Sequence, residues 1–399
     1  MSIVEIIISN LVKMSININK ICQFKHDFKL QLVILYYILN GSSRATTPTI
    51  QNRRERCLQR SVKEEIMSLL NVAVIGTGRI GVLHVENISS LRQKAKIVAV
   101  ADPYASNLEK LRQDFAIPKI YKNYKDVIND EDVDAVIIAT STNTHAEISI
   151  EAARAGKHIF CEKPVDTDPK RILEVIEAVE QNNIIFQTGF NRRFDHNFRR
   201  VREHVIAGSV GDVQIVKVTS RDPAPPSIEY VKISGGIFND MMIHDFDMVR
   251  YLSGSEVIEV NAYGSVLVDP EIGKAGDVDT AIVSLKFANG ALGVIDNSRK
   301  AVYGYDQRVE VFGSKGQAVA ANDKPSTVEL STKSSVTTDK IPHFFLDRYT
   351  GAFLAQFIEF FDAIKEDREP ICNAVDGLRS VEIALAATKS LKENRPVKL

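Results

Sequence analysis

Short apolar runs alternate with segments of helical spacing between Leu70 and Thr188. Strands that alternate with helices pair in parallel through right-handed crossovers, and helices then cover both faces of the sheet. Residues 67–189 are therefore predicted to form a doubly wound α/β domain of the Rossmann type. The expected strands are Leu70–Ile75, Ile97–Ala101, Val133–Ala139, His158–Cys161 and Ile184–Thr188, and the expected helices are Gly78–Leu91, Tyr104–Phe115 and Thr144–Ala155.

Residues 190–399 have a different pattern, with strand-like segments dominant. The expected strands are Val213–Arg221, Val257–Val266, Val278–Phe287, Leu292–Asn297, Arg308–Phe312 and Gln317–Ala320, and the expected helices are Phe238–Leu252, Asp347–Ile364 and Val375–Leu391. Asn289-Gly290, between two of the strands, favours a tight hairpin. We expect an α+β domain with a large, mostly antiparallel sheet for substrate and subunit contacts, and a C-terminal helix that could return to the Rossmann domain.

The expected antiparallel sheet has a consequence for assembly. Such a sheet has a broad open face that another surface must cover. We therefore expect a homo-oligomer, either a dimer or a tetramer.

Residues 1–66 do not share either pattern. The first 60 residues hold nine Lys or Arg against three acidic residues, and their apolar stretches have no clean period. Met67 stands directly before the first predicted strand. We expect this leader to be disordered or to lie outside the functional chain. Its basic, acid-poor composition leaves organelle targeting as an alternative, and a docking segment as another.

The overall composition is that of an ordinary globular protein, 44% apolar and 25% charged. With 50 basic and 51 acidic side chains, no excess charge attracts nucleic acid or an anionic membrane. The longest apolar run, Leu32–Leu39, is far shorter than the roughly 18 residues that a membrane helix needs. The four cysteines show no paired or metal-ligand spacing, so we expect a reducing, cytoplasmic location.

The segment Gly76-Thr77-Gly78-Arg79-Ile80-Gly81 follows the first predicted strand and opens a helix. In such a loop the first glycine allows a tight turn, the second lets the backbone approach a pyrophosphate, and the third allows close packing of helix and strand. The phosphate then meets unpaired N–H groups at the helix N-terminus. Alone, the pattern also fits an ordinary glycine-rich turn.

Asp102 decides between these two interpretations. It ends the second predicted strand, 21 residues after Gly81, where an acidic side chain accepts hydrogen bonds from the adenosine ribose. Its charge would repel the extra phosphate of NADP, so NAD is expected, although Arg79 is compatible with either cofactor. The expected cofactor contacts in this region are Gly76, Gly78, Arg79, Ile80, Gly81 and Asp102.

Cys161-Glu162-Lys163-Pro164 lies just beyond a predicted buried strand. This is the carboxyl edge of the sheet, where open α/β folds bind their ligands. A lysine near a positively charged nicotinamide loses its proton readily or donates a hydrogen bond to an alcohol oxygen. In isolation, Lys163 also fits a surface lysine beside a turn proline.

A second group of polar residues lies in the expected helix Phe238–Leu252. Asp240, His244 and Asp247 are spaced four and three residues apart, so on one continuous helix they form a single stripe, and the remaining surface is mostly apolar. Burying an aspartate and a histidine is costly unless they pair or face a polar ligand. The stripe therefore predicts either a cavity-facing site or a satisfied core pair. No third metal ligand is evident, so no metal is expected.

These motifs together resemble the Gfo/Idh/MocA oxidoreductase family, over about Leu69 to Leu399. Within that family the chain is most similar to the inositol dehydrogenases. Besides the glycine loop, the motifs are Glu162-Lys163-Pro164, Gly189–Asp195, Ser220–Pro223, Gly235–Asp247 and Tyr303–Arg308.

The resemblance implies an NAD-dependent oxidation of a ring secondary alcohol in a cyclic polyol, best fitted by myo-inositol and its 2-keto product. It assigns Lys163, Asp240 and His244 as the catalytic residues. His244 would remove the hydroxyl proton, Asp240 would govern its tautomer, and Lys163 would stabilise the incipient alkoxide. The resemblance further implies cofactor contacts from Thr140, Asn143, His145, Glu162 and Lys163, and substrate contacts from Arg192, Asp222 and Tyr303.

Two other functions fit the same motifs. One is another sugar or polyol dehydrogenase of the family, because spacing alone does not resolve which hydroxyls are recognised. The other is a non-catalytic NAD(P)-binding regulator. A regulator has no need to keep Lys163, Asp240 and His244 together, and this chain has all three.

Overall fold

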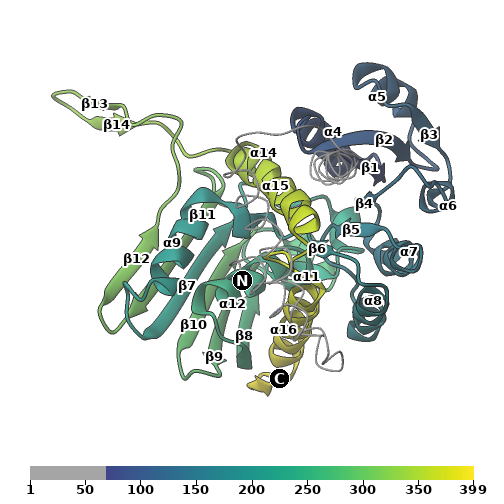
Figure 1. The fold of residues 1–399 in the computed structure, drawn as a ribbon. Helices are drawn as coiled ribbons and strands as arrows, with labels where there is room; N and C mark the ends of the chain where they lie inside the picture. Colours follow the sequence, from purple (N-terminus) through teal and green to yellow (C-terminus); the bar gives the residue numbers. More distant parts are fainter. Residues whose placement is uncertain (1–68) are drawn as a thin grey trace, which may run out of the picture. The chain divides into compact units, whose positions relative to one another are not determined.

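The computed structural model describes residues 69–399, and the expectations for the leader over residues 1–66 fall outside them. These described residues form one unit. Within it lie a parallel sheet and a second, larger sheet, each with its own helices (Figure 1). No helix of residues 69–399 is long and apolar enough to cross a membrane.

The first sheet has six strands in the order β3-β2-β1-β4-β5-β6, all paired in parallel. Apolar clusters pack on both of its faces, as doubly wound topology requires. Its strands are β1 Leu70–Ile75, β2 Ala95–Ala101, β3 Lys119–Tyr121, β4 Ala135–Ile138, β5 His158–Cys161 and β6 Phe186–Thr188, and its helices are α4 Arg79–Ser90, α5 Leu108–Asp114, α6 Tyr124–Ile128, α7 Thr142–Arg154 and α8 Pro169–Asn182.

Three of these elements, β3, α6 and α8, are not among the sequence predictions. The strand β3 has only three residues, which is too short for a period to show. Helix α8 did carry a start signal: the Asp168 side chain accepts from the Lys170 N–H, and Pro169 occupies the first turn.

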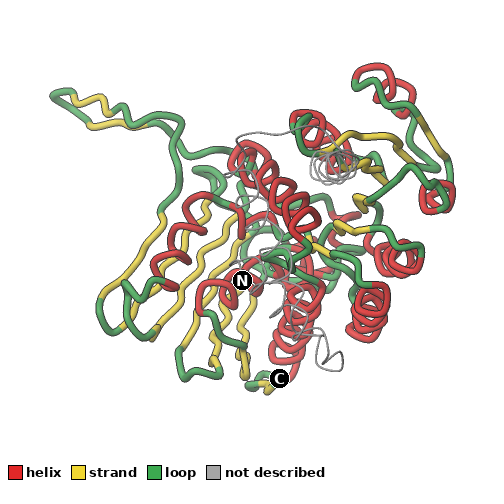
Figure 2. The backbone as a smooth tube through the Cα atoms, viewed as in Figure 1, coloured by secondary structure: helices red, strands yellow, loops and turns green. Residues whose placement is uncertain are grey.

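The second sheet has seven strands in the order β12-β11-β7-β10-β9-β8-β15. All neighbouring pairs are antiparallel except β7 and β10, which are parallel. Helices cover one face, visible as red coils on one side of the yellow strands in Figure 2. The strands are β7 Val213–Arg221, β8 Val257–Ser265, β9 Thr280–Phe287, β10 Leu292–Ser298, β11 Asp306–Gly313, β12 Gly316–Ala320 and β15 Val397–Lys398.

The remaining helices connect or cover these sheets. They are η2 Asn191–Phe194, α9 His196–Ile206, α10 Ile228–Val231, α11 Gly236–Asp240, α12 Ile243–Ser253, α13 Pro270–Lys274, α14 Phe345–Arg348, α15 Thr350–Glu366 and α16 Ala374–Glu393. A hairpin of β13 Glu329–Ser331 and β14 Val336–Thr338 extends away from the second sheet, with every strand residue exposed (Figure 1).

The last two long helices contact both sheets. Phe357, Phe360 and Phe361 of α15 lie in an apolar cluster with Phe160 of β5. Helix α16 packs against α8 and β6 as well as against α12 and β8. The C-terminal part of the chain is therefore built into both sheets, which holds their edges in a defined relation.

The expected helix Phe238–Leu252 is two helices, α11 and α12, separated by Met241-Met242. The Met242 N–H donates to the Ile237 carbonyl, five residues back, and the ordinary ladder is interrupted there. The single-stripe prediction is therefore wrong. Asp247 also does not face a cavity, because its buried carboxylate accepts from Arg193 Nε and Nη2 at 2.9 and 2.6 Å.

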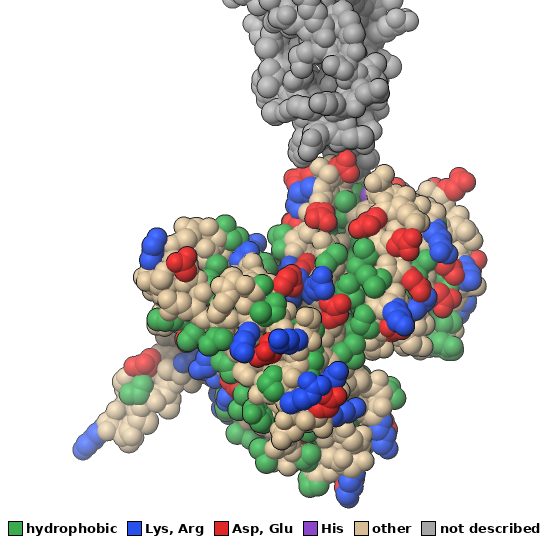
Figure 3. All heavy atoms as spheres, turned by 90° about the horizontal axis from the view of Figure 1, so that it is seen from below, with side chains coloured by type: hydrophobic (Ala, Val, Ile, Leu, Met, Phe, Trp, Pro, Cys, Tyr) green, Lys and Arg blue, Asp and Glu red, His purple; other side chains and the backbone are tan. Residues whose placement is uncertain are grey.

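The surface drawn in Figure 3 has acidic and basic side chains interspersed with apolar ones. No field of a single sign covers that face.

Candidate active site

The glycine loop between β1 and α4 has the geometry of a phosphate-binding turn. Gly76 has φ +91°, and a Cβ there would lie 2.6 Å from the Ala139 main chain. A Cβ on Gly81 would lie 1.9 Å from the Gly76 carbonyl oxygen, so α4 packs directly on the turn. At Gly78 a Cβ would meet nothing within 4 Å.

Gly78 is also the N-cap of α4 and supplies no side-chain acceptor to the helix N–H groups. The backbone is therefore open and electropositive at this position. These residues fit the pyrophosphate of a dinucleotide.

Asp102, at the end of β2, is held rigidly beside that loop. One carboxylate oxygen accepts from the Thr77 N–H at 2.8 Å, and the other from Tyr104 and Ala105 at 2.9 and 3.0 Å. Burial raises the pKa of Asp102, but these backbone hydrogen bonds outweigh it and hold the pKa below its usual value. Asp102 is therefore an anion at neutral pH. Arg79, in the same loop, is exposed and lies over the Phe345 ring at 5.6 Å, and Ile80 is partly buried.

The polar residues after β4 differ in whether their side chains are already paired within the protein. His145 is buried, and its two ring nitrogens lie 2.8 Å from the Pro164 carbonyl oxygen and 3.1 Å from that of Thr140. Burial lowers the pKa of His145, so the ring is neutral and its single N–H donates to one of these two carbonyl oxygens, which lie at the Pro164 segment and at the end of β4. The Thr140 hydroxyl pairs with the Thr144 hydroxyl at 2.7 Å. Asn143 is exposed, one residue inside α7.

Glu162 has a partner that the sequence interpretation missed. Its Oε1 lies 2.7 Å from Nε2 of His84, which is fully buried on α4. His84 follows Gly81 by three residues and so lies on the same helix face, which is the signal that would have found it. The pair joins the helix of the glycine loop to the segment that carries Lys163.

Lys163 reaches across to the C-terminal half of the chain. Its Nζ donates to the main-chain oxygen of Asp240 at 3.0 Å and lies 3.9 Å from the Asp240 Oδ1. Both side chains are largely buried, at 20% and 15% exposed. Two residues that are 77 apart in sequence therefore meet at the carboxyl edge of the parallel sheet.

The Asp240 carboxylate has two further neighbours that sequence spacing did not reveal. The Tyr230 hydroxyl donates to Oδ1 at 2.9 Å, and the Arg299 Nη1 lies 3.4 Å from Oδ2. Asp240 is thus surrounded by two cations and a hydroxyl. Among the described residues its carboxylate makes no hydrogen bond to His244, so the expected control of the His244 tautomer by Asp240 has no direct contact here.

His244 lies in the first turn of α12 with its ring edge toward Phe190, 5.9 Å between centroids. Its Nδ1 is buried and has no hydrogen-bond partner within residues 69–399. Burial, and then the charges of Lys163 and Arg192, hold the pKa of His244 well below its usual value. The imidazole is therefore neutral at pH 7 and has a free lone pair, which is the state that accepts a proton.

The expected substrate residues separate into two groups. Arg192 is buried and donates to Asp245 at 2.5 Å and to the Ser220 and Tyr305 hydroxyls at 3.3 Å each. Burial raises the pKa of Asp222 to about 6, although the charges of Arg299 and Arg192 oppose the rise. Arg192 and Asp222 thus share the electrostatic surroundings of the Lys163–Asp240 contact.

Tyr303 belongs to a different cluster. It is about half exposed, and its hydroxyl donates to Asp306 at 2.7 Å and accepts from Arg221 at 3.4 Å. These contacts do not bring it to Lys163 or Asp240.

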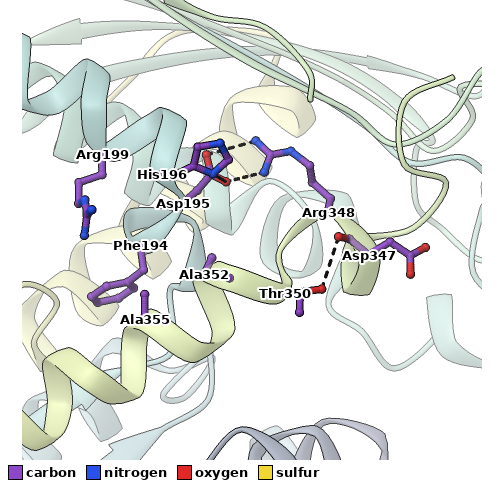
Figure 4. A pocket seen from close by; sticks show the side chains of 10 residues that line it. Phe194, Asp195, His196, Arg199, Asp347, Arg348, Thr350, Ala352 and Ala355 are labelled. Carbon is purple, nitrogen blue, oxygen red and sulfur yellow. Dashed lines mark hydrogen bonds and ion pairs between the residues drawn. The ribbon is translucent and has the colours of Figure 1, made fainter. Parts of the chain in front are cut away.

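A separate surface pocket lies between α9, α14 and the start of α15 (Figure 4). Asp195, His196 and Asp323 have ligand atoms close enough to share a cation. The Asp195 carboxylate, however, already accepts from Arg348 and from the first N–H groups of α9. The cluster is therefore an ion-pair network with a helix cap, and it provides no free ligand set.

Comparison with known proteins agrees with this geometry. A model of the oxidoreductase family with an NAD-binding Rossmann fold matches residues 70–190, and a model of the family's C-terminal alpha/beta domain matches residues 202–399. The chain belongs to the Gfo/Idh/MocA oxidoreductase family. The sequence expectation of this family, and of a Rossmann domain followed by a mostly antiparallel sheet, is confirmed.

Several Gfo/Idh/MocA proteins match over nearly their whole length. The myo-inositol 2-dehydrogenase of Thermotoga maritima is 48% identical over 83% of this chain and 98% of its own. The inositol 2-dehydrogenase of Rhizobium meliloti is 41% identical over 82% of this chain and 98% of its own. A crystal structure of scyllo-inositol dehydrogenase from Lactobacillus casei with bound NAD(H) and scyllo-inositol aligns with a TM-score of 0.78 at 29% identity, covering 83% of this chain and 99% of that one.

Proposed function

We propose that this protein is an NAD-dependent dehydrogenase that oxidises a secondary alcohol of an inositol ring to a ketone, with myo-inositol and its 2-keto product as the best-fitting pair. The observation that carries the proposal is the contact between Lys163 and Asp240, together with a His244 whose buried Nδ1 has no hydrogen-bond partner among the described residues. The names of the relatives from Thermotoga maritima and Rhizobium meliloti support the same reaction.

The oxidation requires the hydroxyl proton and a hydride to leave the ring carbon. Bound NAD supplies the hydride acceptor. Neutral His244 takes up the proton through its free lone pair, and Lys163 donates a hydrogen bond to the alcohol oxygen as negative charge develops there. Asp240 holds the Lys163 ammonium in place through its carbonyl and carboxylate oxygens. General base assistance of this kind contributes about 10² to 10⁴-fold in rate.

The preference for NAD over NADP is part of the proposal. Asp102 is ionised and its two oxygens are fixed by three backbone N–H groups, so it stays at the ribose side of the loop. An anion there accepts from ribose hydroxyls and repels a 2′-phosphate. Gly76, Gly78 and Gly81 would hold the pyrophosphate. Arg79, Ile80, Thr140, Asn143 and Glu162 would line the cofactor side, and His145 would support it through the Thr140 and Pro164 carbonyl oxygens that its ring contacts.

Substrate recognition is assigned to Arg192 and Asp222, with Tyr303 at the periphery. A polyol ring presents hydroxyls that both donate and accept, so a buried cation and a buried carboxylate are complementary to it. The charges of Arg299 and Arg192 stabilise the ionised Asp222 carboxylate, and the charge of Asp240 opposes its ionisation.

We also propose a homo-oligomer formed through the uncovered face of the second sheet. Phe312, Ile215 and Leu292 are in register on β11, β7 and β10, and all three are exposed. Tyr263 and Ile282 continue the same face on β8 and β9. An apolar face of this kind is covered in an assembly, and a second copy is the simplest complement. Light scattering of wild type and Ile215→Lys tests it: a loss of mass in the variant supports the face, and an unchanged mass overturns it.

The buried, free thiols of Cys161 and Cys372 support a reducing, cytoplasmic location.

A substrate panel tests the reaction. Purified protein is mixed with NAD or NADP and with myo-inositol, scyllo-inositol, other inositol isomers, glucose and galactose, and absorbance of the reduced nicotinamide is followed. We expect the highest kcat/KM with NAD and myo-inositol. Faster turnover of an aldose would move the assignment to another polyol or sugar dehydrogenase, and no turnover of any of these compounds would overturn it.

A further inference from the structure

Arg299 is a buried charge to which the sequence motifs assigned no role. It follows β10, its side chain is 1% exposed, and its N–H donates to the Asp279 carbonyl at 2.8 Å. A guanidinium is costly to bury unless it is paired. The next question is therefore which groups compensate for the burial of the Arg299 guanidinium.

The Arg299 guanidinium lies within 4 Å of two carboxylates, and its charge also acts on a third, that of Asp222. Nη1 is 3.4 Å from Asp240 Oδ2, and Nη2 is 3.7 Å from Asp277 Oδ2. These two carboxylates are at opposite ends of the short helix α11. Asp240 is its last residue, and Asp277 Oδ1 accepts from the N–H of Ile237 in its first turn at 3.1 Å.

The N-terminal contact of α11 is also sterically tight. Gly236 has φ +81°, and a Cβ on it would lie 2.8 Å from Asp277 Oδ1. The chain can bring Asp277 so close to the helix only because this residue is glycine. Arg299 and Asp277 thus brace α11 from both ends.

The pairing of Arg299 is weaker than that of other buried arginines in the chain. Arg193 forms a forked pair with Asp247, and Arg348 bonds Asp195 through two N–H groups. In Arg299, Nε and Nη2 have no hydrogen-bond partner among residues 69–399, and neither does Asp277 Oδ2. Forked pairs are the stronger ones, and Arg299 instead makes one contact to each of two carboxylates, so its geometry fits placement of α11 better than strength of pairing.

We propose that Arg299 is a positioning residue that acts through Asp240: it holds α11 so that the carbonyl and carboxylate oxygens of Asp240 stay where Lys163 meets them. The Asp240 carbonyl, which accepts from Lys163 Nζ at 3.0 Å, is main chain and moves only when α11 moves. The catalytic part of this inference rests on the proposed dehydrogenase function. The structural part, the placement of α11, does not.

The test compares Arg299→Met and Arg299→Lys with wild type. In Arg299→Met we expect kcat to fall about 100-fold, because a displacement of about 1 Å at a positioned group costs that much. The KM for NAD stays within about twofold of wild type, because the glycine loop is untouched. Arg299→Lys recovers part of kcat, since an ammonium reaches one carboxylate but does not bridge two. A kcat for Arg299→Met within threefold of wild type overturns the inference.

Arg348→Met is the matched control. Arg348 is equally buried, at 1% exposed, and pairs with Asp195 beside the pocket of Figure 4, away from α11. Its loss lowers Tm but leaves kcat per folded molecule within about twofold. An equal loss of kcat in both methionine variants would mean that removing any buried arginine has this effect, and the inference fails.

Asp277→Asn keeps the inference testable where Arg299→Met does not fold. Asparagine still accepts from the Ile237 N–H but removes the charge that faces Arg299. We expect kcat to fall severalfold with the KM for NAD unchanged, and an unchanged kcat overturns the brace.

A crystal structure of Arg299→Lys or Asp277→Asn separates this inference from the proposed function. A displaced α11 with a longer Lys163–Asp240 distance supports the brace even where wild type turns over no polyol. An α11 in its wild-type position overturns the brace even where wild type is active.

Discussion

The glycine loop before α4 and the α11–α12 segment each contribute one side of the proposed site, and they are built in different ways. In the loop, three glycines within six residues set the turn, the open approach and the helix packing through backbone sterics alone. In the α11–α12 segment, no local contact fixes Asp240. Its carboxylate is held by Tyr230, Lys163 and Arg299, the last two of which are distant in sequence.

This difference explains which part of the proposed site can be recognised from the sequence and which part cannot. A backbone-defined site needs residues at fixed spacing, so it can be recognised from sequence. A site defined by buried charges needs partners whose distances in sequence are arbitrary, so only the fold brings them together. The two histidines repeat the contrast: His84 is paired with Glu162 and is structural, whereas His244 has an unpaired Nδ1 and a lowered pKa.

The largest expected effect on kcat is for a substitution among the buried charged residues. Lys163→Ala should lower kcat about 10³-fold, because the hydrogen bond to the developing alkoxide is lost. NAD affinity, measured by isothermal titration calorimetry, should change by less than about threefold. Near-normal turnover in this variant would remove Lys163 from the mechanism.

Two alanine substitutions in the glycine loop should affect different properties, one the stability of the fold and the other the affinity for NAD. Gly81→Ala places a Cβ 1.9 Å from the Gly76 carbonyl oxygen and should destabilise the fold by about 4 kcal/mol. Gly78→Ala meets no protein atom within 4 Å and should leave Tm unchanged while weakening NAD binding about tenfold, because the methyl group occupies the approach to the pyrophosphate. Thermal unfolding and NAD titration measure the two effects. Equal losses of Tm would contradict the distinct roles.

Asp102→Ser should alter cofactor choice without altering chemistry. Serine no longer repels a 2′-phosphate, so the ratio of kcat/KM for NAD to that for NADP should fall by about tenfold. Steady-state kinetics with both cofactors measures the ratio. A ratio identical to that of wild type would show that Asp102 is not at the ribose.

The smallest effect is on the pH dependence. Burial raises the pKa of Asp222 to about 6, so its carboxylate is ionised above that pH and protonated below it. Burial, together with the charges of Lys163 and Arg192, holds the pKa of His244 well below its usual value, so His244 titrates at lower pH than an ordinary histidine. The acid limb of kcat/KM should therefore lie near pH 6, where Asp222 loses its charge, and should disappear in Asp222→Asn. If the acid limb persists unchanged in Asp222→Asn, a group other than Asp222 causes it.

The His244 shift also carries a prediction for stability. Its folded pKa lies below the unfolded value of about 6.5, so the unfolded chain binds more protons as the pH falls below that value. His244 therefore does not lower the free energy of unfolding above about pH 6.5. It lowers that free energy progressively as the pH falls from about 6.5 toward the lowered pKa of the folded state. Urea unfolding of wild type and His244→Gln at pH 7 and pH 5 measures it: the wild type should lose more stability on acidification than the variant does.

Much of the fold was predictable because its strands are short apolar runs ended by glycine or a polar residue. Leu70–Ile75, His158–Cys161 and Val213–Arg221 are strands with the predicted bounds. Helix continuity was not predictable at Met241-Met242, because both methionines suit a helix and the interruption comes from packing. Sequence analysis missed Tyr230, Asp277 and Arg299. No motif or spacing marks these residues, and each has a role only through a partner that the fold brings close.

The sequence by itself determined the dinucleotide loop, the position of Lys163 after β5 and the family of the chain, because each of these rests on short motifs that are contiguous in sequence. Only the tertiary structure decided that Lys163 meets Asp240 across 77 residues, that Arg299 reaches Asp240 across 59, and that the His244 Nδ1 has no hydrogen-bond partner within residues 69–399. The physical reason is that buried charges are stabilised by whichever opposite charges the fold brings within a few ångströms, and chain distance does not enter that energy.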